Sequence, residues 1–288
     1  MKIYKFAENV NMSNSVLCLG DFDGMHRGHR AVFAAAKSEG NWGVLLFDRN
    51  SKGKPVITSL EEKLDILREI GADFAAVTTF DETFSHMTPE MFAKFIKNEF
   101  DVKAVAAGCD YRFGYKACGD VKLLKKLCGA VGIKTIIADL ASDTCGPIKS
   151  TRIRELIAMG DMRTAAKLLG MNFFVSGKVE HGLKNGRNIG FPTANIEVPQ
   201  EKILPPDGVY AGVVCGKKAV VNIGKNPTFD ATMRTVETHI IDFDGDLYGR
   251  NLKVELTDKI RGEIKFKTIE ELSRQIQKDV KTVKERMS

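Results

Sequence analysis

The sequence predicts a chain of α/β plus β class, in which a doubly wound α/β domain precedes a six-stranded antiparallel β-barrel and a C-terminal helix. Residues 1–170 alternate short apolar runs with amphipathic stretches, a pattern typical of parallel strands covered by helices. After Gly170 the pattern changes to short strands separated by Gly, Pro and Asn turns. A helical period returns only at 269–286. We therefore predict two domains, 1–170 and 171–288.

The first domain owes its predicted fold to strands that alternate with helices. Each strand pattern is short, apolar on both faces and bounded by turn residues, as in a buried parallel sheet. The expected strands are residues 16–19, 43–47, 74–77, 104–107 and 135–138. The expected helices are residues 27–38, 60–70, 89–100, 120–128, 151–159 and 162–168. Thr88 before Pro89 marks a helix start, because Pro is favoured at the first helical position.

The second domain has strand patterns of the kind found in small closed barrels. They fall at residues 174–179, 193–198, 209–215, 219–223, 236–242 and 252–256. In the final helix, apolar residues recur at helical spacing, which predicts a face that covers the barrel. These residues are Ile269, Leu272, Ile276, Val280 and Val283.

Composition limits the classes of partner. The net charge of +6 suits small anionic substrates but gives no dense basic stripe. A nucleic-acid-binding barrel is the rival class; one Trp, five Tyr and no strand that interleaves basic and aromatic residues argue against it. No apolar run approaches the roughly 18 residues of a membrane span, and the N-terminus lacks a signal-peptide core. The six cysteines form no Cys-x-x-Cys pair, so we expect reduced thiols in a cytoplasmic protein. We expect no nucleic-acid or membrane partner, and the sequence leaves the oligomeric state open.

A first group of candidate residues follows the strand at 16–19. His26 and His29 are three residues apart, so they share one face of a helical turn. The helix N-terminus adds free N–H groups and partial positive charge, and Gly28 permits close approach of a phosphate. The arrangement suits stabilisation of the charge that builds on an α-phosphate under attack. A zinc site is the weaker interpretation, since no further ligands stand at suitable spacing.

Ser150, Thr151, Arg152 and Arg154 open a helix after the last strand of the first domain. Ser150 is a plausible N-cap, and Arg152 could clamp phosphates. The alternative is a capped helix with a solvated basic face.

A glycine-rich basic loop precedes the second strand of the barrel. Its glycines let the backbone approach a polyphosphate, and its basic side chains can neutralise phosphate charge. Thr193 and Asn195 lie two apart, so on a strand they face one side and could share a Mg²⁺ with a nucleotide. The alternative is an ordinary hairpin loop. The loop and the turn after it contribute Gly182, Lys184, Arg187, Gly190 and Pro192.

The order of the motifs resembles one family. Five ordered matches in the second domain resemble a riboflavin kinase module. They are Gly190-Phe-Pro-Thr-Ala-Asn195, Asp207-Gly-Val-Tyr-Ala211, Val221-Asn-Ile-Gly224 with Pro227-Thr-Phe229, Val236-Glu-Thr-His239 and Phe243-Asp-Gly-Asp-Leu-Tyr-Gly249. The strings Gly20-Asp-Phe-Asp-Gly-Met-His-Arg-Gly-His29 and Ser150-Thr-Arg-Ile-Arg154 look like an adenylyltransferase module. Together they are similar to the bacterial bifunctional riboflavin kinase and FMN adenylyltransferase, or FAD synthetase, family.

The resemblance implies a nucleotidyltransferase-type, Rossmann-like first domain that adenylylates FMN to FAD and releases pyrophosphate. It implies a barrel that phosphorylates riboflavin to FMN with ATP and Mg²⁺. Flavins would be substrates and products, and the partners would be riboflavin, FMN and ATP. The implied nucleotide contacts, besides the groups above, are Gly20, Asp23, Asp110 and Asn222, with Thr228 as a further candidate. Arg261 and Phe266, in a string similar to the family's flap, would lie near the flavin.

Glu237 is the base that the resemblance implies for the kinase. On a strand it points away from Val236 and Thr238, and we expect it to face into the barrel. Burial there would raise its pKa toward a useful range for a base. The alternative is an exposed glutamate on a strand. His239, on the same face, is either a hydrogen-bond partner within the site or an ordinary strand residue, and we favour the latter interpretation.

Two departures from the family pattern fall in the first domain. Phe47-Asp-Arg-Asn-Ser51 stands where Phe-x-Pro-His-Pro is usual, and Lys149 replaces the first Ser of a Ser-Ser-Thr string. They keep open the alternative of a riboflavin kinase whose first domain binds nucleotide without adenylyl transfer. The presence of His26, His29 and Arg152 argues against that alternative.

Overall fold

The computed structural model describes residues 1–5, 12–48, 53–180, 190–225 and 234–287. Packing of the chain divides it into two compact units, Met1–Ser150 and Thr151–Ser288, which are described separately. The boundary predicted at 170 marks the change in hydrophobic period, whereas the packing boundary lies earlier in the chain. Within the described residues, no helix combines the length and the apolar character needed to cross a membrane.

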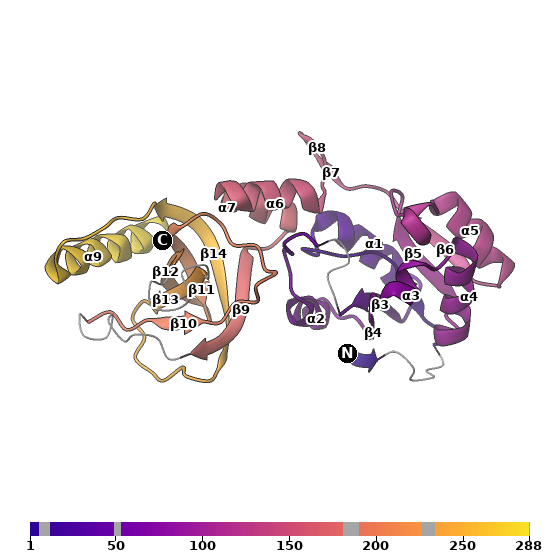
Figure 1. Ribbon diagram of the computed structural model, residues 1–288, viewed down its shortest axis with the longest axis horizontal. Helices are drawn as coiled ribbons and strands as arrows, with labels where there is room; N and C mark the ends of the chain where they lie inside the picture. Colours follow the sequence, from indigo (N-terminus) through magenta and orange to yellow (C-terminus); the bar gives the residue numbers. More distant parts are fainter. Residues whose placement is uncertain (6–11, 49–52, 181–189, 226–233, 288) are drawn as a thin grey trace. The chain divides into compact units, whose positions relative to one another are not determined.

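The first unit is built on a six-stranded parallel sheet (Figure 1). The order of its strands is β1-β4-β3-β2-β5-β6. Its strands are β1 (Lys2–Lys5), β2 (Val16–Cys18), β3 (Trp42–Phe47), β4 (Phe74–Thr78), β5 (Ala104–Gly108) and β6 (Lys134–Ala138). The five predicted strands are confirmed. The edge strand β1 is largely exposed and contains two lysines, so it lacks the apolar pattern that identified the others. A small hairpin follows, β7 (Ser142–Asp143) with β8 (Gly146–Pro147).

The helices of the first unit begin at clear capping signals. Ser59 and Glu62 form a reciprocal capping box at the start of α2, and the Thr88 side chain caps α4, where Pro89 is the first residue as predicted. The single turn α3 is too short to give a helical period in the sequence. The helices are α1 (Arg27–Lys37), α2 (Leu60–Glu69), α3 (Glu82–Ser85), α4 (Pro89–Phe100) and α5 (Val121–Ala130), with a 3₁₀ turn η1 (Tyr115–Ala117).

The order of the strands reverses at β2. The chain runs outward from β2 through β3 and β4, and then returns to place β5 and β6 on the other side of β2. Cys18 at the end of β2 pairs with Ala106 of β5, so the loops that follow these two strands leave the sheet side by side. Open α/β sheets bind ligands at this position, beyond the carboxyl ends of the strands.

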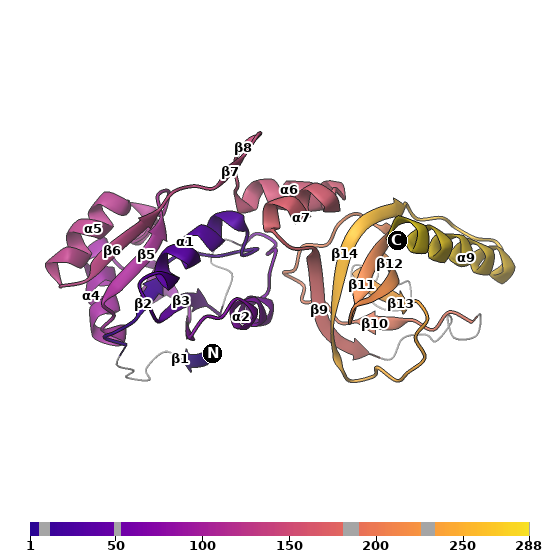
Figure 2. The same cartoon turned by 180° about the vertical axis from the view of Figure 1, so that it is seen from behind.

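The second unit is a closed antiparallel barrel with two helices before it and one after it. The strand order around the barrel is β10-β13-β12-β11-β14-β9. Its strands are β9 (Phe173–Glu180), β10 (Ala194–Ile196), β11 (Gly208–Val214), β12 (Lys217–Lys225), β13 (Arg234–Ile240) and β14 (Asn251–Arg261). The helices are α6 (Ser150–Met159), whose first residue belongs to the first unit, α7 (Met162–Leu169) and α9 (Ile269–Arg286). The prediction of a six-stranded barrel with a final helix is confirmed, and Figure 2 shows α9 alongside β12.

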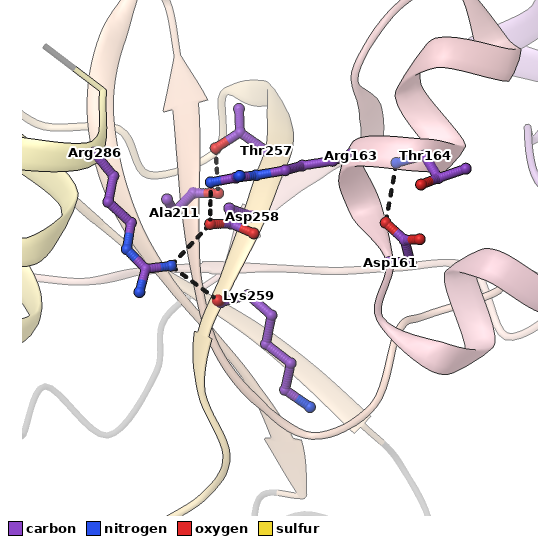
Figure 3. A network of polar contacts seen from close by, with 8 residues as sticks. All are labelled: Asp161, Arg163, Thr164, Ala211, Thr257, Asp258, Lys259 and Arg286. Atoms are coloured by element: carbon purple, nitrogen blue, oxygen red, sulfur yellow. Dashed lines mark hydrogen bonds and ion pairs between the residues drawn. The ribbon is translucent and has the colours of Figure 1, made fainter.

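One carboxylate connects both flanking helices to the barrel (Figure 3). Arg163 of α7 and Arg286 of α9 each donate to Oδ2 of Asp258 on β14, both at 2.8 Å. Asp161 caps α7 by accepting from the backbone N–H of Thr164 at 3.0 Å. Because α7 also packs against β14 and β9, it groups with the barrel although it precedes the change in sequence period.

Candidate active sites

Three predicted site residues stand in a row across neighbouring strands of the barrel. Glu237 on β13 pairs in register with Asn195 on β10 and with Asn222 on β12. Side chains of directly opposite residues lie on the same face, with Cβ atoms roughly 4.5–5.5 Å apart. The fold thus places a carboxyl group between two amides that come from distant parts of the sequence.

Glu237 lies on the outer face of the barrel, so the expectation that it faces the interior is wrong. Buried residues alternate along β13, and Val236, Thr238 and Ile240 fill the interior. Val220, two residues before Asn222, packs on the outer face against Val283 of α9. The sequence period separates the two faces of a strand but does not say which one is inside. Glu237 is nevertheless half-buried, and this burial raises the pKa of its carboxyl group.

His239 holds the segment that enters β10. Its Nδ1 atom lies 2.9 Å from the carbonyl oxygen of Pro192, so Nδ1 carries the proton and donates. The ring also meets Phe191 edge to face, with centroids 5.4 Å apart. An ordinary strand residue was the favoured interpretation of His239, but its contact with Pro192 agrees better with the alternative of a hydrogen-bond partner.

A cavity of about 330 Å³ opens beside this segment. Thr193, predicted as a metal ligand, lines it together with Thr238. The Thr238 hydroxyl is buried and has no hydrogen-bond partner among the residues that the structure describes. The other lining residues are Val179, Pro192, Ala194, Ile240, Phe243, Asp244, Gly245, Asp246, Leu247 and Tyr248. Sequence reasoning did not place the 243–248 segment in the site, although that string was part of the family resemblance.

Several predicted nucleotide contacts lie outside the described residues. They are Gly182, Lys184, Arg187 and Thr228. Gly190 is described and has a φ of 83°, a conformation that glycine adopts without strain.

Arg261 and Phe266, expected near the flavin, lie close to each other. The guanidinium carbon of Arg261 is 6.0 Å from the centre of the Phe266 ring. The guanidinium also makes a bidentate contact with Asp279 of α9, through Nε at 3.1 Å and Nη2 at 2.8 Å. Sequence reasoning missed Asp279, although an aspartate three residues after Ile276, on the apolar face of a helix, is a usable signal.

In the first unit, His26 and His29 are brought together at the start of α1. His26 is the N-cap, and its Nδ1 accepts from the backbone N–H of His29 at 3.3 Å. The two rings are stacked, with centroids 3.5 Å apart. Burial lowers the pKa of His26 to about 4, although Asp110 acts in the opposite direction. The neutral ring therefore carries its proton on Nε2, which is a hydrogen-bond donor.

Gly20 and Gly28 make room for neighbouring rings. A Cβ on Gly28 would lie 3.1 Å from the His26 ring and 3.3 Å from the carbonyl oxygen of Ile148. A Cβ on Gly20 would lie 2.9 Å from the Phe22 ring. A side chain at Gly20 would therefore displace the Phe22 ring, and one at Gly28 would be tight against the His26 ring and Ile148. The predicted contact of both glycines with phosphate stays a prediction.

Asp110 follows β5, beside the loop that carries His26. Its carboxylate lies 3.4 Å from the Nζ atom of Lys149, and both side chains are about half exposed. Lys149, one of the two departures from the family pattern, thus pairs with a predicted nucleotide contact. The other departure is the segment Phe47–Ser51. Within it, Asp48 accepts a hydrogen bond from Thr79 at 2.7 Å, and residues 49–52 lie outside the described ranges.

Asp23 and Ser150 contact each other. The Ser150 hydroxyl donates to the backbone oxygen of Asp23 at 2.9 Å, and Ser150 is already the first residue of α6, so the N-cap role expected for it is not observed. The predicted phosphate contacts Thr151, Arg152 and Arg154 follow on α6, in the second unit. Their role stays a prediction.

Comparison with known proteins agrees with this arrangement. A family model described as FAD synthetase matches residues 8–152, and one described as riboflavin kinase matches residues 169–287. The bifunctional riboflavin kinase/FMN adenylyltransferase of Escherichia coli K12 is 35% identical over 306 aligned positions, covering 99% of this chain and 97% of the relative. That of Bacillus subtilis 168 is 35% identical and covers 93% of this chain and 90% of the relative.

A solved structure has the same fold over the whole chain. A protein from Streptococcus pneumoniae described as a macrolide-efflux protein superposes with a TM-score of 0.86, at 30% identity and with 99% of each chain covered. The matches to both domains favour the two-activity interpretation over a kinase with a silent first domain. The chain therefore belongs to the bifunctional riboflavin kinase/FMN adenylyltransferase family, with a FAD synthetase domain ahead of a riboflavin kinase domain.

Proposed function

We propose that this protein makes FAD from riboflavin in two steps. The barrel transfers the γ-phosphoryl group of MgATP to riboflavin, which gives FMN. The first unit joins FMN to the AMP part of a second ATP and releases pyrophosphate. The observation that carries the kinase assignment is the row of Asn195, Glu237 and Asn222 across three strands, next to the segment that lines the cavity.

Glu237 acts as the base that removes the proton from the reacting hydroxyl of riboflavin. A general base must be unprotonated at the working pH and still bind a proton well. Partial burial raises the pKa of the Glu237 carboxyl group and so makes its carboxylate a stronger proton acceptor. Asn195 and Asn222, on either side, orient the groups that meet at the carboxylate. The cavity beside Thr193 takes the nucleotide.

The residues around the cavity fit a magnesium ion that travels with ATP. Among the described residues there is no cluster of three His, Cys, Asp or Glu side chains that could hold a metal ion. Mg²⁺ commonly keeps several waters and binds through few protein ligands plus substrate phosphates, so such a cluster is not required. Thr193 at the cavity and Asn195, which follows the cavity-lining Ala194 and pairs with Glu237, would hold it. The buried Thr238 hydroxyl is a further oxygen at the cavity. When bound, it would neutralise charge on the phosphates.

In the first unit, His26 and His29 contact the phosphates of ATP. Because the neutral His26 ring has its proton on Nε2, it donates a hydrogen bond where charge develops on the α-phosphate. Lys149 and Asp110 lie beside this loop, and Lys149 supplies a further cation for the polyphosphate.

We infer a cytoplasmic location. All six cysteines are free thiols, four of them exposed, which suits a reducing compartment.

A time course with separated products tests the proposal. Purified protein with riboflavin, ATP and Mg²⁺ should give FMN first and FAD later. His29→Ala should stop FAD formation and spare FMN formation. If FMN accumulates without FAD, even when FMN is supplied as the substrate, the protein has riboflavin kinase activity and no adenylyltransferase activity. Equal loss of both products in His29→Ala would contradict two separate sites.

A further inference from the structure

We propose that Asp23 is a positioning residue for adenylyl transfer, which holds His26 and His29 in place through the β2–α1 loop and does not itself contact phosphate. The inference rests on the proposed adenylyltransferase activity of the first unit. The family resemblance placed Asp23 among the nucleotide contacts. In the structure its side chain is buried, and the residue is only 2% exposed.

The Asp23 carboxylate is occupied by backbone donors from another part of the chain. Its Oδ1 atom accepts from the N–H groups of Ile57 at 2.8 Å and Thr58 at 3.0 Å, and the Thr58 hydroxyl lies 3.4 Å away. The same hydroxyl accepts from the backbone N–H of Gly24 at 2.8 Å. The loop and residues 57–58 are thus joined from both sides, by the bonds to the Asp23 carboxylate and by the bond from Gly24 to the Thr58 hydroxyl. Each of these buried bonds is costly to leave unmade.

The other side of this contact is the fixed start of α2. Ser59 and Glu62 cap the helix, and Lys63 donates to the backbone oxygen of Asp21 at 2.8 Å. Thr58, Ser59, Glu62 and Lys63 are all buried. Buried polar groups that satisfy one another form a rigid network, so the loop is attached to a part of the unit that does not yield easily.

The loop needs such an attachment because its backbone is strained. Phe22 has a φ of 49° and Met25 a φ of 40°, and Asp23 lies between them. A non-glycine residue in this region is strained and persists only where its surroundings fix it. The Phe22 ring meets His29 edge to face at 5.3 Å, and Met25 directly precedes His26. Relaxation of the loop would therefore move both histidines.

The backbone of Asp23 fixes a further predicted site residue. Its carbonyl oxygen accepts from the Ser150 hydroxyl at 2.9 Å. Asp23 thus joins the β2–α1 loop to Ser150 as well as to residues 57–58.

The experiment compares Asp23→Ala and Asp23→Asn in the full chain. Asn keeps an oxygen that can accept from Ile57 and Thr58, whereas Ala does not. Asp23→Ala should lower kcat for FAD formation from FMN about 100-fold, as expected when catalytic groups are misplaced by about 1 Å. It should change KM for ATP by less than about threefold, because the lost stabilisation is specific to the transition state. For Asp23→Asn, kcat for FAD formation should stay within about fivefold of the wild-type value, since the amide oxygen still accepts both hydrogen bonds and only the negative charge is lost.

Two controls accompany these variants. Riboflavin phosphorylation, which takes place in the barrel, should be unchanged in every variant. The second control is Asp73, whose carboxylate also accepts from a distant backbone group, the N–H of Trp42 at 2.9 Å. Asp73 directly precedes β4, so it lies at the amino ends of the strands, away from the β2–α1 loop. Asp73→Ala should leave FAD formation unchanged.

A Mg²⁺ titration distinguishes positioning from metal binding. If Asp23→Asn loses as much activity as Asp23→Ala and both need more Mg²⁺, Asp23 is a metal contact and the inference is overturned. An unchanged kcat in Asp23→Ala also overturns it.

If Asp23→Ala fails to fold, substitutions at Thr58 test the same attachment of the β2–α1 loop. Thr58→Ser keeps the hydroxyl that binds Gly24 and should behave as the wild type, whereas Thr58→Val should lose about tenfold in kcat, as expected for one buried hydrogen bond. Equal activity of these two variants overturns the inference. Absence of FAD with the wild-type protein would instead refute the adenylyltransferase function on which it rests.

Discussion

The imidazole of His239 donates from Nδ1 to the carbonyl oxygen of Pro192 across 2.9 Å, and so joins β13 to the segment that leads into β10. Glu237 lies two residues away on the same face of β13, and Thr193 directly follows Pro192. The proposed base and a proposed magnesium ligand are therefore held in a fixed relation by a residue that need not touch either substrate.

Replacement of His239 should slow riboflavin phosphorylation, and the loss should depend on whether the new side chain can still donate to the carbonyl oxygen of Pro192. Asn offers an amide N–H close to the position of Nδ1, whereas Ala offers no donor. We expect His239→Ala to lower kcat/KM for riboflavin phosphorylation about tenfold, the equivalent of one hydrogen bond, and His239→Asn to lose less than about threefold. FAD formation from supplied FMN is the internal control. Equal losses in the two variants would show that the Pro192 contact is not what matters.

Glu237→Gln should abolish phosphorylation without destabilising the barrel. Loss of a general base costs about 100-fold or more in kcat, and ATP binding should persist. Burial raises the pKa of Glu237, so the folded state prefers its neutral form. The charged form, present above that pKa, therefore opposes folding, and a neutral Gln should leave the midpoint of thermal unfolding at pH 8 unchanged or higher. A clear fall in the midpoint would mean that the charged carboxylate has a partner.

The pH dependence of phosphorylation follows from the same carboxyl group. Activity should rise with pH as Glu237 loses its proton, and the midpoint of that rise should lie above the ordinary value for glutamate. Measurement of kcat from pH 4 to 8 tests this. A rate that does not vary with pH over that range would argue against Glu237 as the base.

Asp279→Ala should destabilise the barrel unit. The Asp279 side chain is 3% exposed and pairs with Arg261, so its removal leaves a guanidinium without its partner, at a cost of about 3–5 kcal/mol. A matched control is Asp242→Asn, which breaks the exposed pair with Lys284 and should cost less than about 1 kcal/mol. Denaturant unfolding of the full chain measures both. Similar effects of the two substitutions would contradict the different burial of the two pairs.

Burial of His26 should make the first unit sensitive to acid. A pKa that falls from 6.5 to about 4 means that the unfolded chain binds the proton first on acidification. The stability that depends on neutral His26 is complete above pH 6.5 and is lost between pH 6.5 and 4, by about 3 kcal/mol in total. His26→Asn keeps an N-cap acceptor but cannot be protonated, so its unfolding free energy should fall less over this range. Parallel curves for the two proteins would contradict the buried, neutral histidine.

The sequence determined the elements and the positions of most candidate residues. Hydrophobic periods identified five parallel strands, six barrel strands and the helix Ile269–Arg286, because a covered strand or an amphipathic helix leaves a local pattern. The motifs placed His26 and His29 after the first buried strand, and the end of that strand lies where the order of the sheet reverses. These features depend on neighbours along the chain.

Tertiary structure decided the contacts between distant residues. A strand period separates two faces but does not identify the inner one, so only closure of the barrel placed Glu237 outside, between Asn195 and Asn222. The Asp23 carboxylate reaches Ile57 and Thr58, and Arg261 reaches Asp279. The carboxylates of Asp23 and Asp279 are buried and must find a partner. That partner is whichever group the fold brings within hydrogen-bond distance, at a sequence separation that no local pattern records.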